Sequence, residues 1–152
     1  MKPEVFQFKS YKFNPQSGIV VFNYTFDNGE KFTEKIVLPK PIKKLAGNRQ
    51  KAFEKALFNL FLITGISYYK IYAPKKIDLG EFQLSKEQVA FWNKTYTKGL
   101  GEFWYRNKLD FRGRVKFPVT KNYKEKGIAI KTSNKNLVPL GGGKDSIVTL
   151  EI

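Results

Sequence analysis

Aromatic and β-branched residues alternate with polar ones at the start of the chain, and this pattern predicts an antiparallel β-meander. The runs lie at residues 5–13, 19–26 and 32–38, and their composition is typical of strands with one buried face. Asn-Pro-Gln-Ser-Gly at residues 14–18 and Asp-Asn-Gly at residues 27–29 separate the runs. These residue types favour tight turns, so we expect consecutive strands to pair as hairpins.

The pattern then changes to a helical period. Apolar residues recur three and four positions apart over residues 48–64, which predicts a helix with one buried stripe. Asn48 is a candidate N-cap and Gly65 a candidate stop. Residues 66–72 are rich in Ile and Tyr, and we expect them to form a strand that ends before Pro74.

A second helical region follows a capping signal. Ser-Lys-Glu-Gln at residues 85–88 has the form of a capping box and predicts the start of a helix. Gly99 and Gly101 interrupt its apolar pattern, and residues 102–107 are expected to form a second, short helix. The polar, basic stretch 113–136 is interpreted as a linker or mobile segment, with a short strand possible at residues 127–130.

The end of the chain combines a short apolar run, three glycines and a new helical pattern. Residues 137–140 are expected to form a buried strand, and glycines occupy positions 141–143 before Lys144. Glycines at such a junction allow the backbone to approach a ligand closely. The N–H groups of the following helix then attract anions. A glycine turn without a ligand is the alternative.

Composition narrows the possible chemistry. The chain has no cysteine and no histidine, which excludes thiol nucleophiles, disulfides, Cys/His zinc sites and a Ser-His-Asp triad. Its 28 basic and 13 acidic residues give a net charge of +15, which suits a phosphate-rich or polyanionic partner or reflects only a solvated lysine-rich surface. No secretory signal or membrane-spanning run is visible, so the cytoplasm is the expected location.

The glycine loop is similar to a known signature. Residues 142–146, Gly-Gly-Lys-Asp-Ser, resemble the Ser-Gly-Gly-x-Asp-Ser motif of the PP-loop ATP pyrophosphatase superfamily, with glycine in place of the first serine. The resemblance implies that the loop holds the pyrophosphate of ATP, and that the enzyme transfers AMP to a substrate oxygen. The implied ATP-binding residues are Gly141, Gly142, Gly143, Lys144, Asp145 and Ser146, with Asp145 also a candidate ligand for Mg²⁺.

A narrower resemblance covers most of the chain. Eight short motifs occur in the same order as in the amino-terminal part of the UDP-N-acetylmuramoyl-L-alanyl-L-glutamate epimerase family, which the chain resembles. They lie at residues 6–11, 57–60, 65–70, 84–88, 91–92, 98–103, 105–107 and 110–113. This implies ATP- and Mg²⁺-dependent inversion of the terminal L-glutamate of a nucleotide-sugar dipeptide to D-glutamate, with release of AMP and pyrophosphate. The product serves peptidoglycan precursor synthesis.

The candidate catalytic residues are charged side chains in and just after the short helix predicted at residues 102–107. Glu102, Arg106, Asp110 and Arg112 lie close together in the sequence, with Asn107 between them. The two arginines are suited to bind phosphate or carboxylate. The alternative is that these residues cap short helices and pair with one another.

These features predict an α+β amino-terminal domain at residues 1–112, an antiparallel β-meander with helices. The segment 113–136 follows, and residues 137–152 form the first β-loop-α of an incomplete α/β PP-loop domain. We expect the full-length protein to be an enzyme and this chain alone, a truncated part, to be inactive and to bind ATP weakly. The alternatives are a PP-loop adenylating enzyme that acts on tRNA, with nucleic acid as its partner, or a non-catalytic binding module.

Overall fold

The amino-terminal half of the chain builds one mixed sheet. The computed structural model describes residues 2–38, 45–131, 141 and 143–151. Strands β1 (Val5–Asn14), β2 (Ile19–Phe26) and β3 (Lys31–Val37) form the predicted antiparallel meander, and β4 (Lys76–Asp78) adds to its edge. The strand order is β3-β2-β1-β4, with β4 parallel to β1.

Both hairpins turn where the sequence predicts. The Asn14 Oδ1 atom accepts hydrogen bonds from the N–H groups of Gln16 (2.9 Å) and Ser17 (3.1 Å), which holds the first turn. Gly18 and Gly29 have φ angles of 68° and 92°, a region in which residues with a Cβ atom are strained. The meander prediction is therefore confirmed together with its turn residues.

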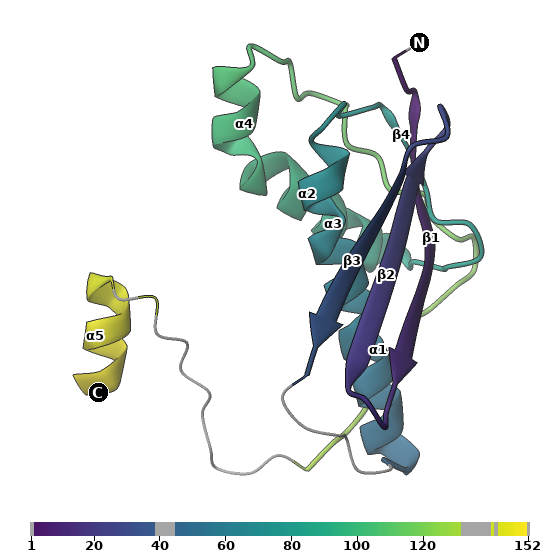
Figure 1. Ribbon diagram of the computed structural model, residues 1–152, viewed down its shortest axis with the longest axis vertical. Helices are drawn as coiled ribbons and strands as arrows, with labels where there is room; N and C mark the ends of the chain where they lie inside the picture. Colours follow the sequence, from purple (N-terminus) through teal and green to yellow (C-terminus); the bar gives the residue numbers. More distant parts are fainter. Residues whose placement is uncertain (1, 39–44, 132–140, 142, 152) are drawn as a thin grey trace.

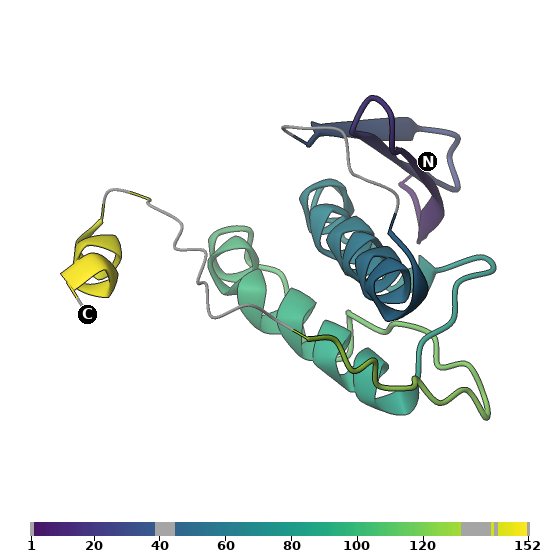
Figure 2. The same ribbon diagram turned by 90° about the horizontal axis from the view of Figure 1, so that it is seen from below.

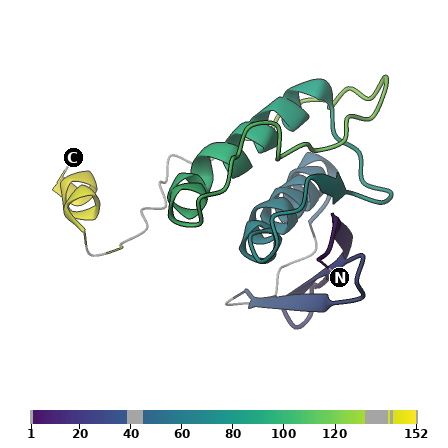
Figure 3. The ribbon, with the colours of Figure 1, turned by 90° about the horizontal axis from the view of Figure 1, so that it is seen from above.

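The helices stack on one face of the sheet. Helix α1 (Gly47–Thr64) lies directly against it, and α3 (Lys86–Gly99) packs on the far side of α1, so the body has a sheet layer and two helical layers (Figure 2). The short helices α2 (Ile66–Tyr69) and α4 (Gly101–Arg106) follow α1 and α3. Helix α5 (Lys144–Glu151) lies apart from this body in each view (Figures 1 and 3). Within the described ranges, no helix is long and apolar enough to cross a bilayer.

The structure corrects the sequence analysis between α1 and β4. Residues 66–69 form α2 and not a strand, because the backbone stays helical at Gly65 and the Gly65 carbonyl accepts the Tyr69 N–H at 2.9 Å. A short apolar run fits a buried helix as well as a strand. The strand at this edge of the sheet is β4, which the sequence analysis did not predict.

Three local predictions also change. The N-cap of α1 is Ala46 and not Asn48, whose side chain instead donates a hydrogen bond to the Ala129 carbonyl at 2.9 Å. Residues 127–130 form no strand. In the expected linker, Val115 and Phe117 are buried in the core, so its first residues are fixed to the body. The domain boundary at residue 112 stays a prediction.

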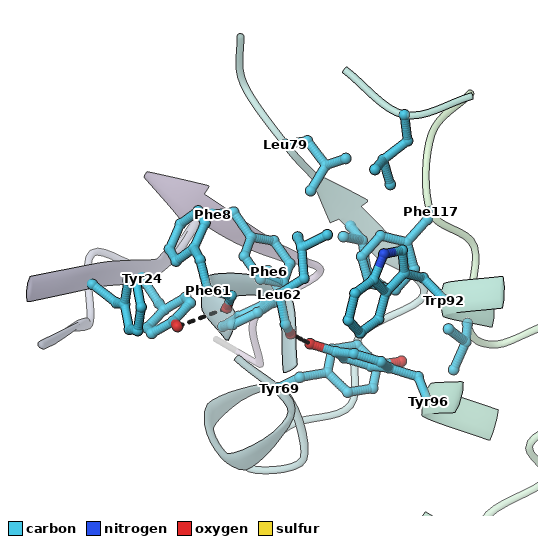
Figure 4. Packing of buried hydrophobic residues seen from close by; sticks show 14 of the residues in the cluster. Phe6, Phe8, Tyr24, Phe61, Leu62, Tyr69, Leu79, Trp92, Tyr96 and Phe117 are labelled. Carbon is cyan, nitrogen blue, oxygen red and sulfur yellow. Dashed lines mark hydrogen bonds between the residues drawn. The ribbon is translucent and has the colours of Figure 1, made fainter. Parts of the chain in front are cut away.

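The core is an aromatic cluster between β1, β2, α1 and α3. Phe61 of α1 packs its ring against Phe8, Phe22 and Tyr24 of the sheet, at centroid distances of 5.1 to 5.5 Å (Figure 4). The Tyr96 hydroxyl of α3 donates to the Leu62 carbonyl at 2.5 Å. No buried side-chain nitrogen or oxygen among the described residues lacks a hydrogen-bond partner, as a stable core requires.

Candidate functional site

Gly141 and Gly143 are hydrogen-bonded to the first turn of α5. The Gly141 N–H donates a hydrogen bond to the Ser146 Oγ atom at 3.1 Å. The Gly143 carbonyl accepts the N–H groups of Ser146 (3.1 Å) and Ile147 (3.3 Å). The serine hydroxyl therefore holds Gly141 near the start of the helix, and the predicted helix after the glycines is confirmed.

The start of α5 has features of an anion site. Lys144 and Asp145 are exposed in the first helical turn, and their N–H groups precede those of Ser146 and Ile147, which the Gly143 carbonyl accepts. A Cβ atom placed on Gly143 would meet no atom of the described residues within 4 Å, so these residues leave the backbone open to a ligand there. The predicted strand at 137–140 and Gly142 lie outside the described residues, and the PP-loop role of this segment stays a prediction.

A magnesium ion fits this loop only together with a phosphate ligand. Asp145 is the one carboxylate in the first turn of α5, and the described part of the chain holds no group of three or more His, Cys, Asp or Glu side chains suited to a metal. Protein-bound Mg²⁺ commonly uses one or two carboxylates and completes its shell with phosphate oxygens and water. Asp145 can supply such a single ligand.

The candidate catalytic residues near α4 form two separate exposed pairs. Glu102 and Arg106 are joined at 2.7 Å one helical turn apart, and each side chain is about three-quarters exposed. Asp110 and Arg112 are 3.6 Å apart at a turn, in which the Asp110 carboxylate also accepts the Arg112 N–H. Asn107 caps α4 through the Phe103 carbonyl.

This arrangement is the pairing and capping that the sequence analysis named as the alternative. Exposed ion pairs of this kind contribute little stability, and the structure does not bring the two pairs together at one buried centre. Asp110 and Arg112 do border a shallow hollow with Trp104, Tyr105 and Phe111. A catalytic role for Glu102, Arg106, Asp110 and Arg112 stays a prediction.

A larger groove, of about 800 Å³, is lined by other residues than the hollow near α4. Helix α1, the loop 81–83 and the segment 123–128 form its walls. Three aromatic rings line one end, and those of Tyr11 and Phe58 each lie near the ring of Phe82, at centroid distances of 5.6 and 5.5 Å. Four lysines lie around the groove: Lys51, Lys55, Lys124 and Lys126.

Glu125 holds the segment 123–128 against α1. Its carboxylate pairs with the Lys55 ammonium and accepts hydrogen bonds from the Tyr123 hydroxyl (2.6 Å) and the Gln88 amide (3.4 Å). Burial alone raises the pKa of Glu125, but these partners outweigh burial and hold the pKa below its ordinary value. The Lys55 ammonium also donates to the Lys126 carbonyl at 2.5 Å.

The sequence analysis missed this groove. Its residues come from four stretches that are distant along the chain, and none of these stretches carries a motif of its own. The segment 123–128 was interpreted as part of the polar, basic linker at residues 113–136. Only the folded chain places that segment beside α1.

Comparison with known proteins gives a consistent family assignment. The family model described as the MurL N-terminal domain matches residues 1–152. The chain is 35% identical over 146 residues to the UDP-N-acetyl-alpha-D-muramoyl-L-alanyl-L-glutamate epimerase of Xanthomonas oryzae pv. oryzae, covering 96% of this chain and 32% of the relative. It is 36% identical over 152 residues to the protein of the same name from Salinispora tropica, covering 97% of this chain and 33% of the relative. No solved structure matches the chain.

Proposed function

The chain belongs to the MurL N-terminal domain family, and on that premise we propose that it is part of an epimerase acting on UDP-N-acetylmuramoyl-L-alanyl-L-glutamate. The observation that carries the proposal is the match over nearly the whole chain to relatives named for this activity. The chain spans about a third of the length of these relatives. The proposed activity belongs to the whole protein, and this chain supplies its amino-terminal part.

The proposed reaction must make a weakly acidic Cα–H bond reactive. ATP supplies AMP to the free α-carboxylate of the terminal glutamate, which forms a mixed anhydride and releases pyrophosphate. The anhydride withdraws electrons, so a general base can remove the Cα proton and a proton can return to the opposite face. Water then cleaves the anhydride and releases AMP, and the D-glutamyl product retains its carboxylate.

The glycine loop is the part of this chain that we assign to ATP. The open backbone at Gly143 and the first turn of α5 accommodate phosphate oxygens. Lys144 adds a positive charge, Ser146 a hydroxyl, and Asp145 a ligand for the magnesium ion that accompanies the phosphates. No described residue of this chain is assigned to the proton transfer.

The test uses the full-length protein with UDP-N-acetylmuramoyl-L-alanyl-L-glutamate, ATP and Mg²⁺. We expect D-glutamate in the hydrolysed product, measured by chiral chromatography, and release of one pyrophosphate per adenylation event. Lys144→Ala should lower kcat/KM by about a hundredfold, the scale of losing a positioned charge in a reacting site. Lys12→Ala on the exposed sheet surface is the matched control and should retain full activity.

Absence of inversion in the wild-type protein would refute the epimerase. Pyrophosphate release without inversion would support the tRNA-directed alternative only if it depended on added tRNA. Retention of full activity in Lys144→Ala would remove the loop from the proposed chemistry. The comparisons favour the epimerase over both alternatives, because the matched relatives share that one name.

A further inference from the structure

The groove between α1, the loop 81–83 and the segment 123–128 has two chemically different ends. The Lys55 ammonium bonds to residue 126 and the Asn48 amide to residue 129. Residues 126–129 therefore run alongside the first half of α1, with Lys51 between the two bonded points. One helical turn beyond Lys55, Phe58 begins the aromatic end.

Three further lysines line the groove and have no ion-pair partner among the described residues. Lys51, Lys124 and Lys126 are exposed. Lys124 also lies near the exposed Glu87 at the start of α3, where its charge helps to lower the pKa of that carboxyl after the larger effect of the Ser85 hydroxyl. The fourth lysine, Lys55, is occupied by Glu125. Several ammonium groups that line one groove favour a ligand with concentrated negative charge, such as a diphosphate.

The aromatic end is a cluster of three neighbouring rings, of which Tyr11 and Phe82 are stacked. The rings of Tyr11, Phe58 and Phe82 lie within about 30° of parallel to one another, with interplanar angles of 30°, 23° and 32°. All three rings are only half-buried, which leaves ring surface available to a ligand. Such rings bind the faces of nucleobases.

The remaining polar groups suit a nucleoside. Asn59 and Gln83 line the groove and carry amides, which pair with the donor and acceptor edge of a pyrimidine. Glu54 and Glu81 also line it, and carboxylates commonly accept hydrogen bonds from ribose hydroxyls. These two acids would repel a ligand that was anionic throughout, so the groove favours one with a neutral end.

We propose that this groove binds the nucleoside diphosphate of a nucleotide sugar, with the base on the Tyr11–Phe58–Phe82 cluster and the diphosphate at Lys51, Lys124 and Lys126. The identity of the base as uracil rests on the proposed function, since the substrate of the epimerase carries UDP. The segment 123–128, which forms one wall, also precedes the glycine loop in the chain. A ligand in the groove would therefore contact the segment that leads to the proposed ATP site.

The test is an NMR titration of the 152-residue chain with UDP, in parallel with ADP. We expect saturable shift changes at the side-chain amides of Asn59 and Gln83, and tighter binding of UDP than of ADP. The double variant Lys51→Glu/Lys124→Glu should weaken UDP binding about tenfold or more, because two attractive charges become repulsive. Phe82→Ala should weaken it to a similar extent through lost stacking.

The controls match the variants in charge and in residue type. Lys12→Glu/Lys35→Glu makes the same change in net charge on the sheet face opposite α1, and Phe91→Ala removes an exposed aromatic ring outside the groove. Both should leave UDP binding unchanged. If Phe82→Ala fails to fold, the lysine variants, which alter only exposed side chains, still decide the result.

Three results would overturn the assignment: no saturable UDP binding, equal weakening by the two double lysine variants, or tighter binding of ADP than of UDP. The full-length protein separates this inference from the proposed function. Inversion activity with an unchanged KM for the nucleotide sugar in Lys51→Glu/Lys124→Glu would refute the groove alone. UDP binding that maps to the groove, in a protein without inversion activity, would support the site and refute the epimerase.

Discussion

Three tyrosines of the core keep their hydroxyl groups buried and bonded. Tyr24, Tyr69 and Tyr96 are at most 1% exposed, and their hydroxyls donate to the carbonyls of residues 61, 74 and 62. A buried hydroxyl with a partner is tolerated, whereas a buried phenolate is not. Burial accordingly raises the pKa of Tyr69 to about 12 despite the nearby Arg114, and it raises the pKa of Tyr96 well above the ordinary value.

This burial predicts loss of stability in alkali. Below about pH 10 these tyrosines are protonated in both the folded and the unfolded chain, and the free energy of unfolding is unaffected by them. Above pH 10 the unfolded chain releases their protons first, so the free energy of unfolding should fall as the pH rises towards 12. Urea unfolding followed by circular dichroism between pH 8 and pH 11.5 measures this.

Tyr96→Phe should make that alkaline loss shallower, at a cost of about 1 kcal/mol near neutral pH for the lost hydrogen bond. Tyr105→Phe is the control, because Tyr105 is 85% exposed and should leave the slope unchanged. A free energy of unfolding that stayed constant to pH 11.5 would contradict the assignment.

Position 65 needs glycine because neighbouring side chains leave no room for a Cβ atom, and not because of its backbone angles. Its φ of −57° suits any residue, but a Cβ atom there would lie 2.6 Å from the ring of Phe8 and 3.1 Å from that of Tyr24. Both rings are fully buried and cannot move aside. Gly65→Ala should destabilise the fold by about 1–3 kcal/mol in urea unfolding. Gly101→Ala, where a Cβ atom meets nothing within 4 Å, should be neutral or slightly stabilising.

At the scale of elements, the start of α3 is held by the predicted capping box. The Ser85 Oγ atom accepts the Gln88 N–H at 3.3 Å, and the Gln88 side chain accepts the Ser85 N–H at 2.9 Å. Gln88 also reaches Glu125 across the groove. The cap therefore links the start of α3 to the segment that lies along α1.

Ser85→Ala should cost about 1 kcal/mol of unfolding free energy, because it leaves a helix N–H without its acceptor at a site that is 2% exposed. Thr95→Ala within the same helix is the matched control and should change stability by less than about 0.5 kcal/mol. Equal effects from the two variants would show that the cap contributes nothing beyond helix propensity.

At the scale of the whole molecule, the described part of the core lies before residue 118, and α5 lies apart from it. Among the described residues, the buried hydrophobic ones run from Phe6 to Phe117, and the described side chains of α5 are exposed or half-exposed. Ile147 and Val148 of α5 are 58% and 57% exposed. A helix in a globular protein normally buries such an apolar stripe, so we expect the longer protein that we propose to cover this face of α5.

A chain that ends at Lys131 should therefore unfold at the same temperature as the 152-residue chain, within about 2 °C. Differential scanning calorimetry of both chains measures this. A shorter chain that ends at residue 112 is the informative comparison. It lacks Val115 and Phe117, which are buried in the core, so its unfolding temperature should be lower by several degrees. A large drop on removing residues 132–152 alone would place that segment in the cooperative unit.

The features that the sequence predicted correctly depend on neighbours along the chain. The three strands of the meander, the turns at Gly18 and Gly29, the capping box at Ser85 and the helix after Gly143 are encoded in short stretches. The resemblance of the motifs to the epimerase family is likewise a property of linear order, and the family is confirmed.

The features that only the tertiary structure decided depend on contacts between distant residues. The run 66–69 continues the helical backbone of Gly65 and places Tyr69 in the core against Tyr96 of α3, with ring centroids 5.5 Å apart. β4 pairs with β1 from more than sixty positions away. The groove exists because Glu125 binds Lys55. Local pattern sets periodicity and turns, whereas the partner of each buried face, and thus the shape of a binding site, is determined by which surfaces meet when the chain folds.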